Sequence, residues 1–131
     1  FKLFDAQSEL AYLSINSIVE IGQSLWIATD EGLFTLNIQT YQVKKISLPG
    51  INNSAIKINV LKLLSRDRIA VGSNQSLCWI VNKENEIITI KNPFNQSNNF
   101  QPVLSIVEDA NQNIWFTTSF DELYAFSSDY F

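Results

Sequence analysis

The chain has 131 residues, and its hydrophobic content of 46% is enough for one compact domain with a core. Nine lysines and arginines stand against thirteen aspartates and glutamates, for a formal net charge of -4. This balance provides no basic stripe for phosphate groups, so we expect neither nucleic acid nor an anionic membrane surface as a partner.

The chain begins at Phe1 without an initiator methionine, and no apolar run approaches the roughly 20 residues that span a bilayer. We therefore interpret it as a partial segment, with no direct membrane insertion of its own. Cys78 is the single cysteine and lies in an apolar run, which predicts a buried thiol that acts as a small hydrophobe.

In chain order, short apolar segments alternate with polar turns. Residues 1–13 are predicted to form two strands, the second at Glu9–Leu13. Four strands follow, at residues 17–21, 25–28, 33–36 and 41–48. The segment 25–28 is apolar at successive positions, as expected when neighbours cover both faces of a sheet. The segment 41–48 alternates and carries lysines, which is typical of an outer edge strand.

The same order of strands then returns twice. Strands are predicted at residues 60–64, 68–72, 77–81 and 86–90, and a third set begins at Val103 and ends at Phe126. No segment shows an apolar stripe at helical spacing. These patterns predict an all-β fold made of about three four-stranded antiparallel β-propeller blades.

The predicted organisation is a partial propeller over residues 1–131. Its parts are outer strands of a blade at 1–13, a blade at 14–56, a blade at 57–101 and the inner three strands of a blade at 102–131. Closed propellers have about four to eight blades, so we expect an open arc or part of a larger propeller. Three blades alone leave apolar flanks exposed, and such patches mark interfaces.

Internal similarity supports this division. The stretch Leu25–Phe34 returns, altered, as Ile114–Tyr124, and a weaker copy lies at Ile69–Ile80. The spacing between copies is roughly 44 residues, within the range of propeller blades. Trp26 and Trp115 share one position of this repeat.

The segment Ser105–Thr118 contains an apolar strand, Asp109, an Asn-rich turn and then Ile-Trp-Phe-Thr-Thr. In this order it resembles the two-component regulator propeller repeat, which continues Leu/Ile-Trp-Ile-Gly-Thr after its turn. There are departures, because Ala28 and Thr117 replace the usual Gly, Ile21 replaces the Asp, and the weaker copy has Ala70 in place of the Trp.

The resemblance implies a sensor. In that family such blades form the extracytoplasmic input region of bacterial membrane receptors, with a histidine kinase or diguanylate cyclase downstream. It therefore implies a periplasmic or extracellular location and a role in ligand binding and signal transduction.

The tryptophans are the first candidates for a ligand site. Trp26 and Trp115 could form a stacking platform for a sugar, but their place inside apolar strands favours packing between blades. Trp79 falls outside the Trp position of the repeat, so the sequence leaves open which side of the sheet it faces.

A calcium loop is the second candidate. Asp109–Asn113 places oxygen ligands at alternate positions, but Ile114 stands where such a loop needs Gly and Phe120 where it needs Glu. A hairpin of Asx turns is favoured, and no metal site is expected. Glu20 and Glu108 occupy equivalent repeat positions, which predicts a structural role such as a hydrogen bond at the strand end.

Catalytic groups are scarce. The chain has no histidine, and Cys78 and the serines lack any partner base. The pairs Asp30–Glu31 and Asp121–Glu122 sit in equivalent turns, which favours solvated turn residues over the facing carboxylates of a glycosidase. A sialidase-type repeat is disfavoured, because only two arginines are present. We predict no catalytic residue and no cofactor.

Three functions remain open. The first is a non-catalytic sensor segment that binds a small extracellular ligand such as a saccharide. The second is a structural or interaction module whose partners are other copies of itself or the remainder of a larger propeller. The third is a fragment of a glycan-active propeller enzyme. No ligand-binding residue is nominated from the sequence.

Overall fold

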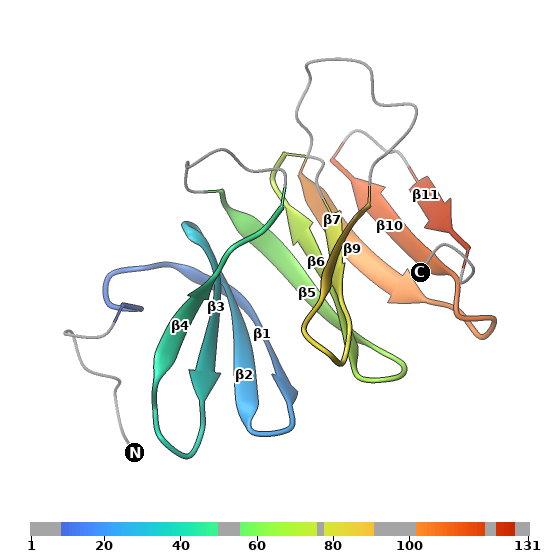
Figure 1. Cartoon of the computed structure of the whole chain (residues 1–131). Coiled ribbons are helices and arrows are strands. Elements are labelled where there is room, and N and C mark those ends of the chain that lie inside the picture. Colours follow the sequence, from blue (N-terminus) through green and yellow to red (C-terminus); the bar gives the residue numbers. More distant parts are fainter. Residues whose placement is uncertain (1–8, 50–55, 76–77, 91–101, 120–122, 128–131) are drawn as a thin grey trace.

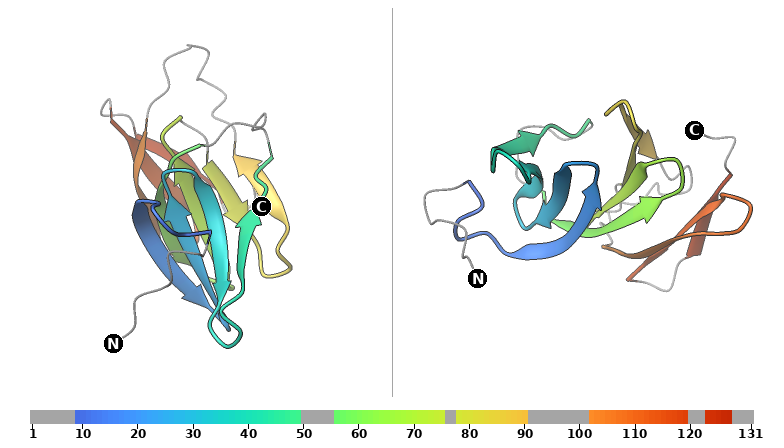
Figure 2. Two further views of the ribbon diagram at one scale, coloured as in Figure 1. Left: turned by 90° about the vertical axis from the view of Figure 1, so that its left-hand side faces the viewer. Right: turned by 90° about the horizontal axis from the view of Figure 1, so that it is seen from below.

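The computed structural model describes residues 9–49, 56–75, 78–90, 102–119 and 123–127. Within these ranges the chain forms eleven strands and no helix, so the predicted all-β class is confirmed. The strands make three antiparallel sheets that follow one another in chain order (Figures 1 and 2). Among the described residues there is no helix long and apolar enough to cross a membrane.

Sheet 1 is a meander of four strands. Its strands are β1 (Ile15–Ile21), β2 (Ser24–Thr29), β3 (Gly32–Asn37) and β4 (Val43–Ile46). Gly22 has a φ of 58° in the turn between the first two strands, a conformation that favours glycine. The last strand is shorter than the predicted segment 41–48, because Tyr41 adopts a φ of 62° and donates its N–H to the Asn37 carbonyl.

Sheets 2 and 3 repeat this meander. Sheet 2 contains β5 (Ile58–Leu64), β6 (Arg68–Ser73), β7 (Cys78–Val81) and β8 (Ile87–Ile90). Sheet 3 contains β9 (Val103–Glu108), β10 (Ile114–Thr118) and β11 (Leu123–Phe126). The predicted strands in this part of the chain lie in these elements, with two exceptions. Glu86 precedes β8, and Leu77 lies outside the described residues.

The N-terminal segment differs from its prediction. Residues 9–12 form turns instead of the strand expected at Glu9–Leu13. Tyr12 has a φ of 65°, which is incompatible with an extended strand, and the Leu13 N–H donates to the Leu10 carbonyl. Leu10 and Leu13 pack on a small apolar cluster of sheet 1. Residues 1–8 lie outside the described residues, and the four blade boundaries remain a prediction.

The strand registers allow the residues of the three sheets to be aligned with one another. Trp26 lies opposite Val19 on β1, and Trp115 lies opposite Val107 on β9. Each first strand also carries a register shift at the same place. The residues at these shifts are Asn16, Asn59 and Leu104. The sheets are therefore structural repeats, and residues can be compared position by position.

The core lies between the sheets. We call the contact between sheets 1 and 2 joint 1, and the contact between sheets 2 and 3 joint 2. One large apolar cluster fills each joint. Ile69 and Val71 of β6 point into joint 1, whereas Ala70 points into joint 2. This division explains why the middle strands are apolar at successive positions. The first strands β1, β5 and β9 are neighbours, so the sheets are joined along one inner edge.

Candidate functional site

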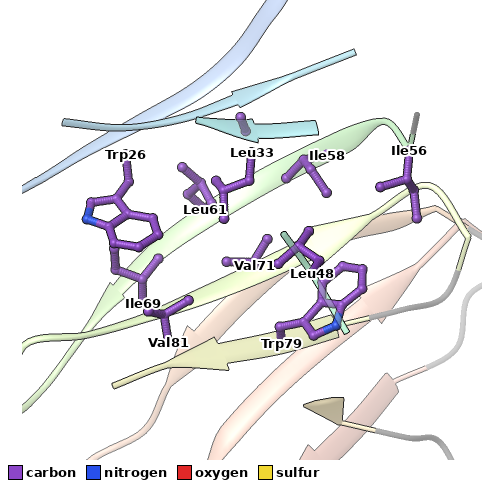
Figure 3. Packing of buried hydrophobic residues seen from close by; sticks show 11 residues of the cluster. Trp26, Leu33, Leu48, Ile56, Ile58, Leu61, Ile69, Val71, Trp79 and Val81 are labelled. Atoms are coloured by element: carbon purple, nitrogen blue, oxygen red, sulfur yellow. The ribbon is translucent and has the colours of Figure 1, made fainter. Parts of the chain in front are cut away.

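Joint 1 is held mainly by large apolar side chains. Trp26 is 7% exposed and packs with Leu33 against Ile69 and Val71 of the next sheet (Figure 3). The prediction that Trp26 packs between blades is confirmed.

Trp79 is fully buried in the same joint, so it is not available to a ligand. Its indole N–H donates to the Pro49 carbonyl at 3.0 Å, which satisfies its one polar group. Phe34 and Tyr124 occupy the equivalent place on the third strand of their sheets. This repeated aromatic position was missed in the sequence, because the residue type changes in each copy and the spacing varies with the turns.

Joint 2 contains an ionic cluster. The Glu108 carboxylate accepts the Ser65 backbone N–H at 2.8 Å and the Ser65 hydroxyl at 2.9 Å. It also accepts a hydrogen bond from Arg68 Nη2 at 2.9 Å, and Arg68 Nε donates to the Ser65 carbonyl at 3.0 Å. The side chains of the Arg68–Glu108 pair are only 10% and 14% exposed. Glu108 therefore joins the end of β9 to the β5–β6 turn, which confirms its predicted structural role.

Glu20 does not make the equivalent contact. Its side chain is exposed at the end of β1, and within the described part of the chain no hydrogen bond or ion pair to its carboxylate is found. The prediction of a shared role with Glu108 is therefore wrong for Glu20 in this structure. The physical reason is that no described sheet lies on that side of sheet 1 (Figure 1).

Polar side chains connect the first strands at the register shifts. The Asn16 amide donates to the Ile58 carbonyl at 2.9 Å, and the Asn59 amide donates to the Val103 carbonyl at 3.4 Å. These two bonds are equivalent, since each joins the shift of one first strand to the beginning of the next. The position is occupied by Leu104 in sheet 3, which cannot donate.

A charged group lies next to the first of these bonds. The Asn16 amide also donates to Asp30 Oδ1 at 3.0 Å, and the Lys57 ammonium lies 4.0 Å from the same oxygen. We call Asn16, Asp30 and Lys57 the inner-edge group. Its two charged side chains are about half exposed, so they can meet both each other and a solute. Glu31 instead donates its backbone N–H to Thr29 Oγ1 within its own turn. The matching pair Asp121–Glu122 lies outside the described residues.

Trp115 is 38% exposed, so the prediction that it packs between blades is wrong for this chain. Its indole N–H donates to Asp109 Oδ2 at 2.8 Å. Its neighbours Ile114 and Phe116 on β10 are buried in joint 2, so Trp115 points to the other side of sheet 3. No described sheet lies on that side (Figure 1). Leu104, Val107 and Leu123 are exposed on the same sheet.

The turn Asp109–Asn113 is a hairpin of Asx turns, as predicted. Asp109 Oδ1 accepts the backbone N–H groups of Asn111 at 2.8 Å and Asn113 at 2.9 Å. The hydrogen bond from Trp115 contributes most to lowering the pKa of Asp109, followed by the one from the Asn113 backbone. The carboxylate is thus occupied by its own hairpin. In the described ranges no three His, Cys, Asp or Glu residues gather to hold a metal ion.

Cys78 is buried in joint 2, as predicted. Burial raises the pKa of its thiol to about 12, from an ordinary value of 9.0. A thiol in this state is a packing group and not a nucleophile.

Comparisons with known proteins agree with this architecture. The family model described as "two component regulator propeller" matches residues 97–120. No curated protein matches the sequence.

Three solved structures with the same fold are extracellular domains from B. thetaiotaomicron. Two structures of the BT4673 domain, one described as a one component and one as a hybrid two component system, align with TM-scores of 0.73 and 0.70 at 21% identity. The two alignments cover 89% and 88% of this chain, and each covers 16% of the BT4673 chain.

The extracellular domain of the hybrid two component system BT3049 aligns with a TM-score of 0.63 at 20% identity, covering 85% of this chain and 14% of the other. This chain therefore spans about one sixth of the length of the structures it matches. At these identities the likeness shows the fold, which confirms the predicted propeller blades.

Proposed function

This chain carries a two component regulator propeller repeat, and from that premise we propose that it is a non-catalytic sensor segment of a bacterial signal-transduction receptor. The proposed location is periplasmic or extracellular. The proposed ligand is a small extracellular molecule, such as a saccharide, and the signal passes to a neighbouring domain.

The observation that carries the proposal is the agreement of two independent comparisons. The family match is made on the sequence of the third repeat, whereas the structural alignments cover most of the chain. The family model is described as a two component regulator propeller, and the aligned structures are extracellular domains, which supports the proposal. The residues themselves supply little chemistry for a reaction, since Cys78 is buried and Asp109 is held within its own turn.

The inner-edge group is our candidate for the ligand contact. Asp30 accepts hydrogen bonds, and the Lys57 ammonium donates them, so together they can bind a molecule with several hydroxyl groups. Both lie at the end of a strand near joint 1, and Asn16 connects them to the next sheet through the Ile58 carbonyl. A ligand here would meet two blades at once.

Contact with two blades gives the ligand a way to act. A ligand shifts a receptor only by binding one arrangement better than another, with a coupling of about 1–3 kcal/mol in typical cases. A ligand that bridges Asp30 and Lys57 would favour the arrangement in which the sheets meet as they do here.

The test compares two lysines in the longer receptor that contains this segment. Lys57→Ala should lower ligand-dependent output, whereas Lys62→Ala, on an exposed position of β5, should leave it unchanged. Deletion of residues 1–131 should abolish the response. Unchanged signalling after deletion would overturn the sensor proposal, and equal effects of the two lysine variants would overturn the inner-edge group as the contact.

A second candidate is a structural or interaction module, favoured by the exposed apolar residues on sheet 3. Its partners would be the remainder of a larger propeller or other copies of the chain. Light scattering on the purified segment distinguishes these two kinds of partner. A monodisperse small oligomer supports self-completion, and a lone monomer supports completion by other blades.

A further inference from the structure

One backbone hydrogen bond recurs in all three sheets and aligns the residues around it. The residue after the second strand of each sheet donates its N–H to the carbonyl of the residue that precedes the first strand. The three bonds run from Asp30 to Ser14 at 3.1 Å, from Asn74 to Lys57 at 3.0 Å and from Ser119 to Pro102 at 3.2 Å. Asp30 and Asn74 are therefore equivalent, and so are Lys57 and Pro102.

In joint 1 the Asp30 carboxylate meets donors from both sheets. Asp30 Oδ1 accepts a hydrogen bond from the Asn16 amide of its own sheet at 3.0 Å. The Lys57 ammonium, from the residue that precedes the next sheet, lies 4.0 Å from the same oxygen. The polar atom that follows the second strand is thus accompanied by an amide and a cation.

Asn74 holds the same place in joint 2 but has neither donor. Its side-chain oxygen Oδ1 is buried and has no hydrogen-bond partner among the described residues. The Asn59 amide, which matches the Asn16 amide, donates to the Val103 carbonyl at 3.4 Å. The residue that matches Lys57 is Pro102, whose side chain has no donor.

A buried oxygen without a partner needs an explanation. Buried side-chain oxygens in native structures nearly always accept a hydrogen bond, and an exception indicates a water, an ion or a ligand that completes the site. An ammonium group is favoured here, because joint 1 has one at the equivalent place. An ammonium group also carries three donors and no acceptor, so it adds no further polar group that needs a donor.

We propose that Asn74 Oδ1 anchors a binding site for a protonated primary amine at the inner edge of joint 2. The amine takes the place that the Lys57 ammonium holds in joint 1. Asn74 as a whole is partly exposed, so a rotation of its side chain brings the oxygen within reach of a solute. The site concerns joint 2 alone, and it depends neither on the sensor role nor on the inner-edge group.

The experiment titrates the isotope-labelled 131-residue chain with methylammonium chloride at constant ionic strength. The reporter is the side-chain amide of Asn74 in the amide NMR spectrum. We expect a saturable shift with a dissociation constant on the order of 10–100 mM, because so small a cation makes few contacts.

Two other solutes separate the chemistry of the amine from its charge. Tetramethylammonium has the same charge but no N–H donor, so it should not shift the Asn74 amide. Glycerol donates hydroxyl hydrogens without a charge, and it should shift the amide less than methylammonium does at equal concentration.

Substitutions at Pro102 test the equivalence with Lys57. Pro102→Lys supplies a tethered ammonium group that competes for Asn74 Oδ1, so the apparent affinity for methylammonium should fall at least about threefold. Pro102→Ala is the matched control, because it removes the proline ring without adding an ammonium group. It should bind methylammonium as the unmodified chain does.

A conservative change at the anchor gives the opposite effect. Asn74→Asp creates the carboxylate that joint 1 has at Asp30, and it should tighten methylammonium binding about tenfold, because the hydrogen bond becomes charge-assisted on both sides. The backbone amide of Gln75 reports binding in this variant.

Four outcomes contradict the proposal. It is overturned if the Asn74 amide does not respond to methylammonium, or responds equally to tetramethylammonium or glycerol. It is also overturned if Pro102→Lys binds methylammonium as tightly as Pro102→Ala, or if Asn74→Asp binds it no more tightly than the unmodified chain. None of these outcomes bears on receptor output, so a failure here is distinct from a failure of the sensor proposal.

Discussion

Joint 1 and joint 2 connect equivalent sheets with different chemistry. At the same repeat position, joint 1 has the indole of Trp26 and joint 2 has the methyl group of Ala70. In joint 2 the sheets come close at Gly72, and the Arg68–Glu108 pair joins the start of β6 to the end of β9. A repeat position therefore specifies where a side chain lies in a joint. The facing sheet determines which contacts that side chain makes.

Trp26 and Trp115 give the largest expected contrast. Trp26→Ala removes a buried indole from joint 1 and should lower the free energy of unfolding by about 3–5 kcal/mol. Trp115→Ala removes a partly exposed ring with no facing sheet, so its cost should be below about 1 kcal/mol. Urea denaturation of both variants measures the difference. Equal losses would mean that the side of sheet 3 that carries Trp115 is covered in solution.

Glu108 and Glu20 give the next contrast. Glu108→Gln leaves the Arg68 guanidinium without its counter-charge and should cost about 2–3 kcal/mol, because the pair is mostly buried. Glu20→Gln changes an exposed carboxylate and should cost less than about 0.5 kcal/mol. Thermal unfolding of the two variants in parallel tests this. A large effect of Glu20→Gln would contradict the absence of a partner in the isolated segment.

The sequence predicted the repeat well because its signals are local. Alternating apolar runs and turn residues such as Gly22 specify strands, and the strands have nearly the predicted bounds. The strand at 9–13 was wrong because apolar residues such as Leu10 and Leu13 pack equally well from a turn. Residue types alone do not distinguish a strand from a turn whose apolar side chains pack on a sheet.

The joints were less predictable because their chemistry depends on facing sheets. Nothing in the segment 65–68 indicates that it binds Glu108, about forty residues later in the chain. Trp79 could be placed only once the register of β7 was known. The equivalence of Glu20 and Glu108 was visible in the sequence, but their different surroundings were not.

Gly72 tests the close approach in joint 2. A Cβ at this position would lie 2.7 Å from Val103 Cγ1 and 2.8 Å from Val60 Cγ1. Gly72→Ala should therefore lower the free energy of unfolding by about 1–2 kcal/mol through overpacking. Joint 1 accommodates Ala28 at the equivalent position, so the restriction is specific to joint 2.

A rescue variant identifies the cause. Val103→Ala removes the nearer of the two methyl contacts, so it should be less destabilising in the Gly72→Ala background than in the native chain. A double-mutant cycle from urea denaturation gives this coupling. Purely additive effects would show that the cost of Gly72→Ala does not come from the Val103 Cγ1 contact but from the remaining ones, such as Val60 Cγ1 at 2.8 Å.

Cys78 makes joint 2 sensitive to alkaline pH in a way that joint 1 is not, since Leu33 holds the equivalent place in joint 1. The thiol has an ordinary pKa of 9.0 when unfolded and of about 12 when buried. Between these values the unfolded chain loses the proton first. The contribution of the protonated Cys78 thiol to the free energy of unfolding is therefore complete below pH 9 and is lost as the pH rises toward 12.

The matched control is Cys78→Ala, which lacks a titrating group at the same place. Its stability at neutral pH should be lower because of the smaller side chain, but it should fall less steeply than that of the native chain between pH 9 and 11. The two proteins differ only at this side chain, so the difference in slope isolates the thiol. Parallel slopes would mean that water reaches Cys78 through an opening of joint 2, and the thiol would then react with iodoacetamide faster than the chain unfolds.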